Sequence, residues 1–372
     1  MYFPKSDSWE TVEPGDAGFD PGRFAEAMNA AALLDLGVSR DLREMMPDGT
    51  RHPNDRPLGP LKDRGLVNGL VLRHGYIVGE FGDTLAPDVT FSATKSYISA
   101  VAGLAQLDGL IDDLDAPVAE TVADGGFEGH NATITWRHLL QQTSEWEGEL
   151  FGIPDWIDRG RQVSGRAAEA ESRVGGSAGL AESRRSLEFP GTFWEYNDVR
   201  VNRTALALLR LYGHALPVVL RQRLMDPIGA SDTWQWHGYS TSGVDVEGQR
   251  IESVSGGAHW GGGMWVSTRD HARFGHLYLN RGRWDDRRIL DGAWVDETVA
   301  PCALNASYGL MWWLNHEGSV SRAAGTAAFA ARGAGGNVVF VDPETEVVIV
   351  LRWCRSARSA IDGFLSALKH ES

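Results

Sequence analysis

The sequence predicts an α/β fold in which a sheet built from both ends of the chain carries an inserted, mainly helical domain. Apolar-rich segments with the alternation typical of strands lie near the two ends, at residues 67–81 and 337–353. The stretch from Ser96 to about Ala230 has mostly helical spacing of its apolar residues. We therefore expect an α/β domain of residues 1–95 and 231–372, a helical domain of residues 96–230, and a functional site where they meet.

Local signals place the individual elements in order. Helices are expected where a capping residue or an apolar face opens a helically spaced segment: residues 20–34, 135–142, 199–212 and 357–368. Strands are expected on either side of the His74-Gly75 turn and of the turn at residues 342–345, with a further strand at residues 308–314. These strands would form two hairpins and one additional strand of the sheet.

Composition excludes several classes of function. The chain has 35 Lys and Arg against 50 Asp and Glu, so its net charge of −15 repels polyphosphates and excludes nucleic acid as a partner. No apolar run reaches the length of a membrane span, and the first residues lack a leader pattern, so we expect no membrane association and a cytoplasmic location. Cys302, Cys354 and the scattered histidines show no metal-ligand spacing.

The most informative motif is Ser92-Ala93-Thr94-Lys95, which stands where a helically spaced segment begins. Positions i and i+3 share one face of a helix, so the serine hydroxyl faces the lysine amine. The unbonded N–H groups of a first helical turn can stabilise a developing oxyanion. This is the S-x-x-K pattern of acyl-serine hydrolases.

A competing serine lies in Gly175-Gly176-Ser177-Ala178-Gly179, which fits the G-x-S-x-G pattern. That pattern requires a strand before the serine and a helix after it. The residues before it are polar and unlike a buried strand, so the context disfavours Ser177 as a nucleophile.

A serine hydroxyl needs a base within hydrogen-bond reach, and Lys95 can serve only when it is neutral. A nearby phenol would pass the proton onward. Tyr196 supplies one, because it follows the Pro190-Gly191 turn and precedes the helix expected from Val199.

Together these residues resemble the penicillin-recognising serine hydrolases, in the branch that holds class C β-lactamases and family VIII carboxylesterases. Two further segments are similar to the family's pattern: residues 134–144, and the glycine-rich turn into a helix at residues 261–270. The resemblance covers roughly residues 15–368 and implies a β-lactamase/transpeptidase-like fold. It also implies a cofactor-independent enzyme.

By resemblance, Ser92 is the nucleophile, Lys95 the base, and Tyr196 the phenol that relays the proton to the leaving group. The oxyanion hole would combine the backbone N–H of Ser92 with one from an edge strand that carries K-T-G or H-x-G in the family. Counting back from the last hairpin puts that triplet at residues 328–330, which makes the Ala331 N–H the second donor.

Two departures from the family pattern bear on the chemistry. Residues 328–330 offer no cation for a substrate carboxylate, and Arg332 is the alternative cation on that segment. Asp198 stands where the family often has asparagine. An anion there would favour the ammonium form of Lys95, leaving Tyr196 as the base, or it would simply cap the following helix.

Four residues are candidates for substrate binding: Asp198, Trp194, His259 and Tyr308. For His259 and Tyr308 the competing interpretation is a structural role, and Glu145 and Glu147 are expected to be solvated or capping. A tryptophan-rich cleft without a strand cation suits uncharged substrates. The sequence therefore predicts a serine hydrolase that acts on small carboxylic esters. Its alternatives are an amide hydrolase of the aminohexanoate-oligomer type, a β-lactamase, and a non-catalytic ligand-binding relative, and a homodimer is left open.

Overall fold

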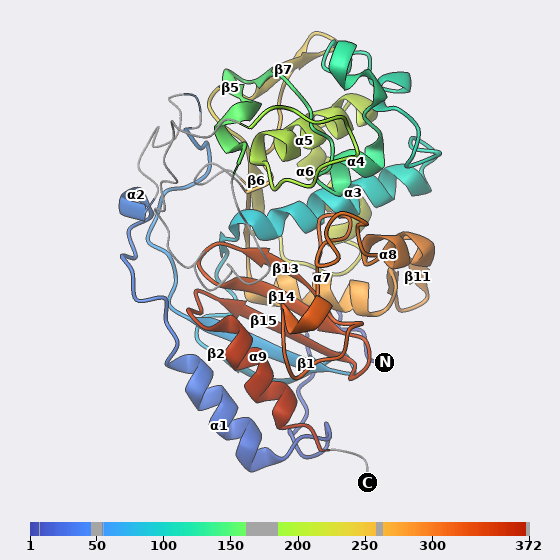
Figure 1. Cartoon of the computed structure of the whole chain (residues 1–372). Coiled ribbons are helices and arrows are strands. Elements are labelled where there is room, and N and C mark those ends of the chain that lie inside the picture. The colour runs from blue at the N-terminus through green and yellow to red at the C-terminus, as the bar shows by residue number, and fades with distance from the viewer. Residues whose placement is uncertain (7, 46–53, 55, 161–184, 258–262, 370–372) are drawn as a thin grey trace.

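The computed structural model describes residues 1–372 apart from 7, 46–53, 55, 161–184, 258–262 and 370–372. Its main sheet is antiparallel and has six strands in the order β12-β13-β14-β15-β1-β2 (Figure 1). The strands come from both ends of the chain: β1 Asn68–Arg73, β2 Tyr76–Phe81, β12 Trp313–Leu314, β13 Phe329–Gly333, β14 Asn337–Asp342 and β15 Val347–Arg352. The two predicted hairpins are present, and they meet where β1 pairs with β15.

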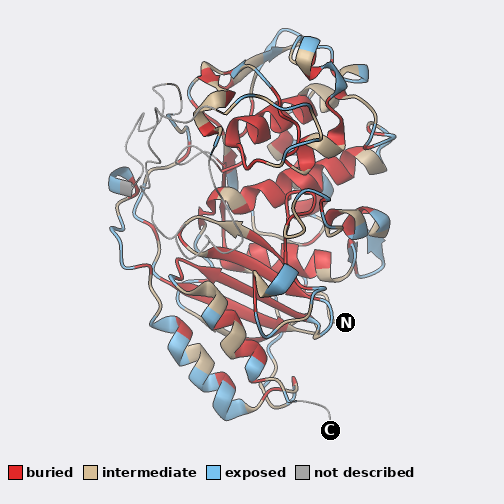
Figure 2. Ribbon diagram, viewed as in Figure 1, coloured by how far each residue is buried: buried red, intermediate tan, exposed pale blue. Residues whose placement is uncertain are grey.

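Both faces of this sheet are covered, which explains why β15 is apolar along most of its length. Successive side chains of a strand point to opposite faces. Val348 and Val350 accordingly belong to the core beneath α7 (Thr268–Leu279), whereas Ile349 and Leu351 pack with α1 (Pro21–Ala32) and α9 (Ala357–Ser366). In Figure 2 the strands are buried between these helices.

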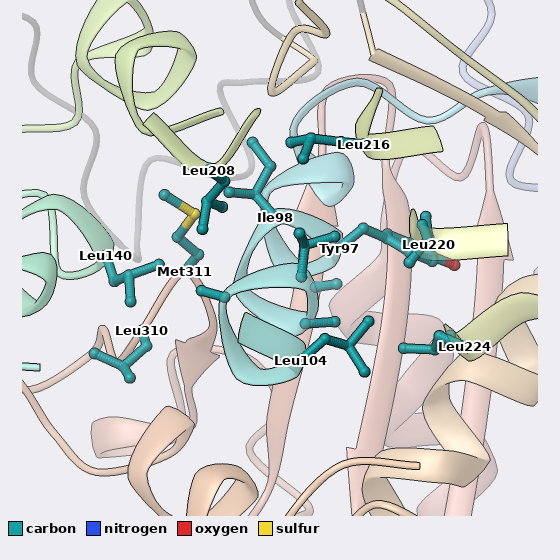
Figure 3. Packing of buried hydrophobic residues seen from close by; sticks show 14 of the residues in the cluster. Tyr97, Ile98, Leu104, Leu140, Leu208, Leu216, Leu220, Leu224, Leu310 and Met311 are labelled. Atoms are coloured by element: carbon teal, nitrogen blue, oxygen red, sulfur yellow. The ribbon is translucent and has the colours of Figure 1, made fainter. Parts of the chain in front are cut away.

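The helical part of the chain is organised around α3 (Thr94–Leu107), which is buried from Thr94 to Ala105. Its neighbours are α4 (Trp136–Leu140), α5 (Asp198–Tyr212) and α6 (Leu216–Leu220). Figure 3 shows Ile98 and Leu104 of α3 among the leucines of these elements. Because α3 is enclosed by packed side chains along most of its length, it holds the residues at its N-terminus in a fixed position.

The remaining described elements are short. The helices and 3₁₀ or π turns are α2 Leu42–Met45, η1 Phe91–Ala93, η2 Val118–Glu120, η3 Gly129–Thr133, η4 Asp155–Asp158, η6 Arg221–Met225, α8 Gly292–Thr298 and η7 His316–Gly318. The strands are β3 Asp88–Val89, β4 Glu149–Leu150, β5 Ile153–Pro154, β6 Gln235–His237, β7 Gly243–Val246, β8 Gln249–Glu252, β9 Gly263–Val266, β10 Arg283–Trp284 and β11 Arg287–Arg288. β3 and β6 flank β9 in a separate small sheet.

Two sequence-based expectations need correction. The strand expected at residues 308–314 is reduced to β12, because Met311 adopts a positive φ of 60° and its N–H donates to the Leu140 carbonyl. The segment expected to turn directly into a helix at residues 261–270 contains β9 before α7 begins.

Stability should depend on pH through the buried His276 of α7. Its Nε2 donates to the Tyr2 carbonyl oxygen over 2.8 Å, and burial lowers its pKa to about 4. The unfolded chain binds this proton near pH 6.5, so stability falls as pH drops below that value. We expect a loss of about 2 kcal/mol between pH 7 and pH 5 from this residue.

Urea unfolding of the wild type and of His276→Gln at pH 7 and pH 5 measures this contribution. The variant should lose less stability on acidification than the wild type, since it has no imidazole to protonate. The same pH dependence in both proteins would contradict the assignment.

Candidate active site

Ser92 lies in the single 3₁₀ turn η1, between β3 and the start of α3. The residue before it, Phe91, has a φ of 48°, which is uncommon for a bulky side chain and turns the chain sharply into the helix. Phe91 is held in this conformation by burial, with its ring edge-on to Trp353 at 5.9 Å between centroids. Ser92 itself is partly exposed, whereas Lys95 is 1% exposed. The nucleophile candidate is therefore accessible and its lysine is not.

Lys95 meets three acceptors around its amine. Its Nζ lies 2.9 Å from Ser92 Oγ, 2.9 Å from Asp198 Oδ1 and 3.2 Å from the Gly256 carbonyl oxygen. Three acceptors match the three N–H donors of an ammonium group. The ring of Tyr196 lies 4.8 Å from the same nitrogen and presents a face that attracts a cation. The amine is thus enclosed by three acceptors and one aromatic face.

Asp198 is not the helix cap that one interpretation of the sequence expected. Asn197 caps α5, since its side chain accepts a hydrogen bond from the Arg200 N–H, and Asp198 is the first helical residue. Asp198 is 2% exposed, and its N–H donates to Asp158 Oδ2 over 3.0 Å. Its carboxylate is directed at Lys95. The expected substrate-binding role of Asp198 therefore becomes one of holding Lys95.

Tyr196 belongs to an aromatic cluster with Trp313 of β12 and the two candidate residues Trp194 and Tyr308. Its ring is stacked on Trp313 at 5.8 Å between centroids and lies edge-on to Tyr308 at 6.3 Å. Trp194 is also edge-on to Tyr308, at 5.5 Å. The structure thus brings Trp194 and Tyr308 next to the phenol that the sequence assigned to proton relay.

Tyr308 is buried and fixed by Gln142, a residue that the sequence reasoning did not single out. Gln142 Nε2 lies 3.1 Å from the Tyr308 hydroxyl, and its Oε1 accepts the Asn197 N–H over 2.8 Å. Burial raises the pKa of Tyr308 well above its usual value, so this phenol stays neutral. Gln142 thereby ties the aromatic cluster to the segment that carries Tyr196. Its φ of 60° puts it at a turn, but no signal in the sequence linked it to Tyr308.

Gly333 is the point at which β13 crosses the nucleophile turn. A Cβ atom at this position would lie 2.1 Å from the Thr90 carbonyl oxygen and 3.2 Å from the Ser92 nitrogen. Only glycine allows this approach. The family's K-T-G or H-x-G triplet ends in glycine, so it corresponds to Ala331-Arg332-Gly333. The sequence-based prediction places it three residues earlier, at residues 328–330.

The backbone of Ala331 is turned away from the site. Ala331 lies opposite Val339 of β14, while Ala330 lies between Trp313 of β12 and Phe340 of β14. The Asn315 N–H donates to the Ala328 carbonyl. The residues in and just before β13 whose backbone faces β12 are therefore Ala328 and Ala330, whereas the backbone of Phe329 and Ala331 faces β14. Since alternate residues of a strand direct their N–H groups to opposite neighbours, the Ala331 N–H faces β14.

This alternation corrects the expected second oxyanion donor. Beyond Ala330, the next N–H groups that face the β12 side are those of Arg332 and Ala334, the two neighbours of Gly333. β12 ends before it reaches them. One of these two amides, together with the Ser92 N–H, is the candidate pair of donors for an oxyanion.

The remaining candidates either have a structural role or lie outside the described residues. His259 and Ser177 belong to segments 258–262 and 161–184, which the structure does not describe. Glu145 is fully buried and bonded to Arg200 and Arg185, so its role is structural rather than solvated or capping. Among the described residues, no helix is long and apolar enough to cross a lipid bilayer.

The antiparallel sheet, with helices on both faces and α3 leading away from its edge, is the β-lactamase/transpeptidase-like fold, whose members are serine hydrolases. The chain belongs to the Beta-lactamase family, because the family model of that description matches residues 89–359.

Relatives within this fold carry several activities in their names. The 6-aminohexanoate-dimer hydrolase of Paenarthrobacter ureafaciens is 25% identical over 303 residues, which cover 76% of this chain and 70% of the relative. A β-lactamase of Mycobacterium bovis has a TM-score of 0.54 at 18% identity, covering 80% of this chain and 92% of its own. A family VIII carboxylesterase also has a TM-score of 0.54, at 16% identity, covering 88% and 97%. These two structural similarities show the shared fold.

Proposed function

We propose that the protein hydrolyses carboxylic esters of small substrates through an acyl-enzyme on Ser92. The observation that carries this proposal is the buried Lys95 amine, 2.9 Å from both Ser92 Oγ and Asp198 Oδ1. A buried ion pair is costly to form and adds little stability by itself. The placement of the Lys95–Asp198 pair against the partly exposed Ser92 hydroxyl is explained by activation of that serine.

In the proposed acylation, Tyr196 acts as the base and Lys95 stays an ammonium that stabilises the phenolate. Ser92 Oγ attacks the carbonyl carbon while its proton passes to the phenolate oxygen of Tyr196. The resulting oxyanion is bound by the Ser92 N–H and an amide of the Arg332–Ala334 segment. Tyr196 then returns the proton to the departing alkoxide, which leaves as an alcohol. Water, activated in the same way, releases the acid and restores Ser92.

Amide hydrolysis is the second candidate. It is favoured by the name of the Paenarthrobacter relative, a 6-aminohexanoate-dimer hydrolase, whose similarity covers most of both chains. An amide leaving group needs protonation more than an ester alkoxide does, so the same residues would serve either reaction.

A fluorophosphonate probe tests the nucleophile. It should label wild-type protein and Ser177→Ala equally, and it should fail to label Ser92→Ala, with the labelled peptide identified by mass spectrometry. Loss of labelling in Ser177→Ala instead would overturn the assignment. No labelling of folded wild type would favour a non-catalytic ligand-binding protein.

A substrate panel distinguishes the reactions. Phenyl and alkyl esters, a linear amide dimer and a chromogenic cephalosporin should be compared by kcat/KM with the wild type. The proposal expects the highest values for the esters; a cephalosporin or amide preferred over every ester would replace it with the corresponding activity.

A further inference from the structure

We propose that Asn202 and Ser255 are positioning residues that hold the Gly256 carbonyl oxygen against the Lys95 amine. This inference rests on the proposed function, because it concerns the reaction at the same Ser92 site. Both side chains act through the backbone of residues 255–257, which carries the carbonyl.

The Gly256 carbonyl oxygen is one of the three acceptors around the Lys95 amine, at 3.2 Å from Nζ. The other two are Ser92 Oγ and Asp198 Oδ1. In the proposed acylation Ser92 Oγ becomes an ester oxygen, which is a much weaker acceptor than a hydroxyl. Asp198 and Gly256 then hold the amine until water releases the acid. The position of the carbonyl therefore matters in both halves of the reaction, and most in the second.

Asn202 fixes Gly256 from helix α5. It lies one helical turn after Asp198, so the two side chains share a face of the helix. Its Oδ1 accepts the Gly256 N–H over 2.9 Å, and the residue is 2% exposed. A Cβ atom on Gly256 would clash with Val201 Cγ1, so the helix and the glycine are in direct contact. One helix thus holds the Lys95 amine directly through Asp198 and indirectly through Asn202.

Ser255 fixes the orientation of the same carbonyl. The Gly256 C=O and the Gly257 N–H belong to one planar peptide unit and point in opposite directions. Ser255 Oγ accepts that N–H over 3.1 Å and lies 2.7 Å from the Tyr239 hydroxyl oxygen. The Ser255 carbonyl accepts the Trp236 Nε1–H over 2.8 Å, which anchors the segment to β6. The Gly256 carbonyl therefore cannot rotate without breaking a buried hydrogen bond.

The same segment touches the nucleophile turn on the side away from the amine. Gly257 has a φ of 81°, and a Cβ atom there would overlap the Phe91 carbonyl oxygen and lie 2.9 Å from the Ser92 nitrogen. A shift of the Gly256 peptide would therefore disturb the lysine and the serine together. Misplacement of reacting groups by about 1 Å can cost about 100-fold in rate.

Asn202→Leu and Ser255→Ala test the assignment, because each removes one acceptor and changes the side-chain volume little. With enzyme in excess, nitrophenolate release from p-nitrophenyl acetate measures acylation. The decay of acetyl-Ser92 in quenched samples, followed by mass spectrometry, measures deacylation. We expect each variant to lower both rate constants by about 10-fold or more, with the larger loss in deacylation.

Thr204→Val is the matched control. Thr204 is a buried polar residue of the same helix, and its hydroxyl donates to the Arg200 carbonyl within α5. Its loss weakens the helix without touching Gly256. Both rate constants should stay within about twofold of the wild type, even though urea unfolding shows a lower stability.

The double variant Asn202→Leu with Ser255→Ala distinguishes positioning from general destabilisation. If both residues act through one carbonyl, the second substitution should lower deacylation by less than about threefold beyond the first. Losses that multiply would show independent effects and would overturn the proposal.

Rate constants equal to those of the wild type in the single variants, with only stability reduced, would also overturn it. So would a loss confined to acylation, or an equal loss in Thr204→Val, which would assign the effect to loosening of α5. Failure of the wild type to form acetyl-Ser92 is a different result, because it would refute the proposed function itself before any variant is compared.

Discussion

Replacing Lys95 by methionine should lower kcat/KM for p-nitrophenyl acetate by about 10³- to 10⁴-fold. Methionine has a similar length and no charge, so it removes the cation beside Ser92 Oγ while filling most of the same volume. In the proposed mechanism this cation stabilises the Tyr196 phenolate, and without it the base is lost together with the lysine. Steady-state kinetics on folded protein measures the effect.

The same substitution also has a structural effect that must be separated from the catalytic one. Lys95 and Asp198 are 2% and 3% exposed in their side chains, so removal of the lysine leaves a buried carboxylate without its cation. Breaking a buried pair in this way costs about 3–5 kcal/mol of stability. Asp198→Asn alone should also destabilise the protein, since the ammonium then loses its counter-ion.

The double variant Lys95→Met with Asp198→Asn distinguishes the two effects. Because neither charge remains, it should recover much of the stability that Lys95→Met loses, as measured by urea unfolding. Its activity should stay as low as that of Lys95→Met. Recovery of both stability and activity in the double variant would mean that Lys95 acts only by neutralising Asp198, and the catalytic assignment would then be wrong.

What the sequence could predict about this site depends on how local each relation is. Ser92 and Lys95 are three positions apart at the start of one helix, so a helical period suffices to bring them together. The Asp198 prediction also held in one respect: the carboxylate does contact the lysine. Its competing role as a cap failed by one position, because Asn197 takes the cap instead.

The position of β13 could not be predicted in the same way. A shift of a strand by one residue moves every side chain to the opposite face, and the sequence does not fix that register. Here β13 is joined to β14 by the turn at residues 334–336, so that Gly333 pairs with Asn337. Counting back from the last hairpin therefore placed the triplet three residues too early, at residues 328–330.

Tyr196→Phe should lower kcat/KM for an alkyl ester such as ethyl butyrate by about 10²-fold or more. Phenylalanine keeps the ring, with its stacking on Trp313 and its face toward Lys95, and removes only the oxygen that carries the proton. Stability by urea unfolding should fall by no more than about 1 kcal/mol, the cost of one lost hydrogen bond, so a much larger loss of activity reports on proton transfer.

Tyr308→Phe is the matched control, because Tyr308 is a buried tyrosine in the same aromatic cluster. Its hydroxyl accepts a hydrogen bond from Gln142 Nε2. We expect this variant to lose about 1 kcal/mol of stability with the hydrogen bond and to keep most of its activity. A loss of activity as large as that of Tyr196→Phe would assign proton transfer to the cluster as a whole instead of to Tyr196.

The leaving group determines how much of the Tyr196 effect should be visible. Nitrophenolate departs without protonation, whereas an alkoxide needs a proton in the transition state. If Tyr196 both activates Ser92 and protonates the leaving group, its removal should affect ethyl butyrate more than p-nitrophenyl butyrate, although both form the same butyryl-enzyme. Equal losses on the two esters would restrict Tyr196 to activation of Ser92. A loss confined to the nitrophenyl ester would contradict both roles, since no step assigned to Tyr196 is specific to a leaving group that departs unprotonated.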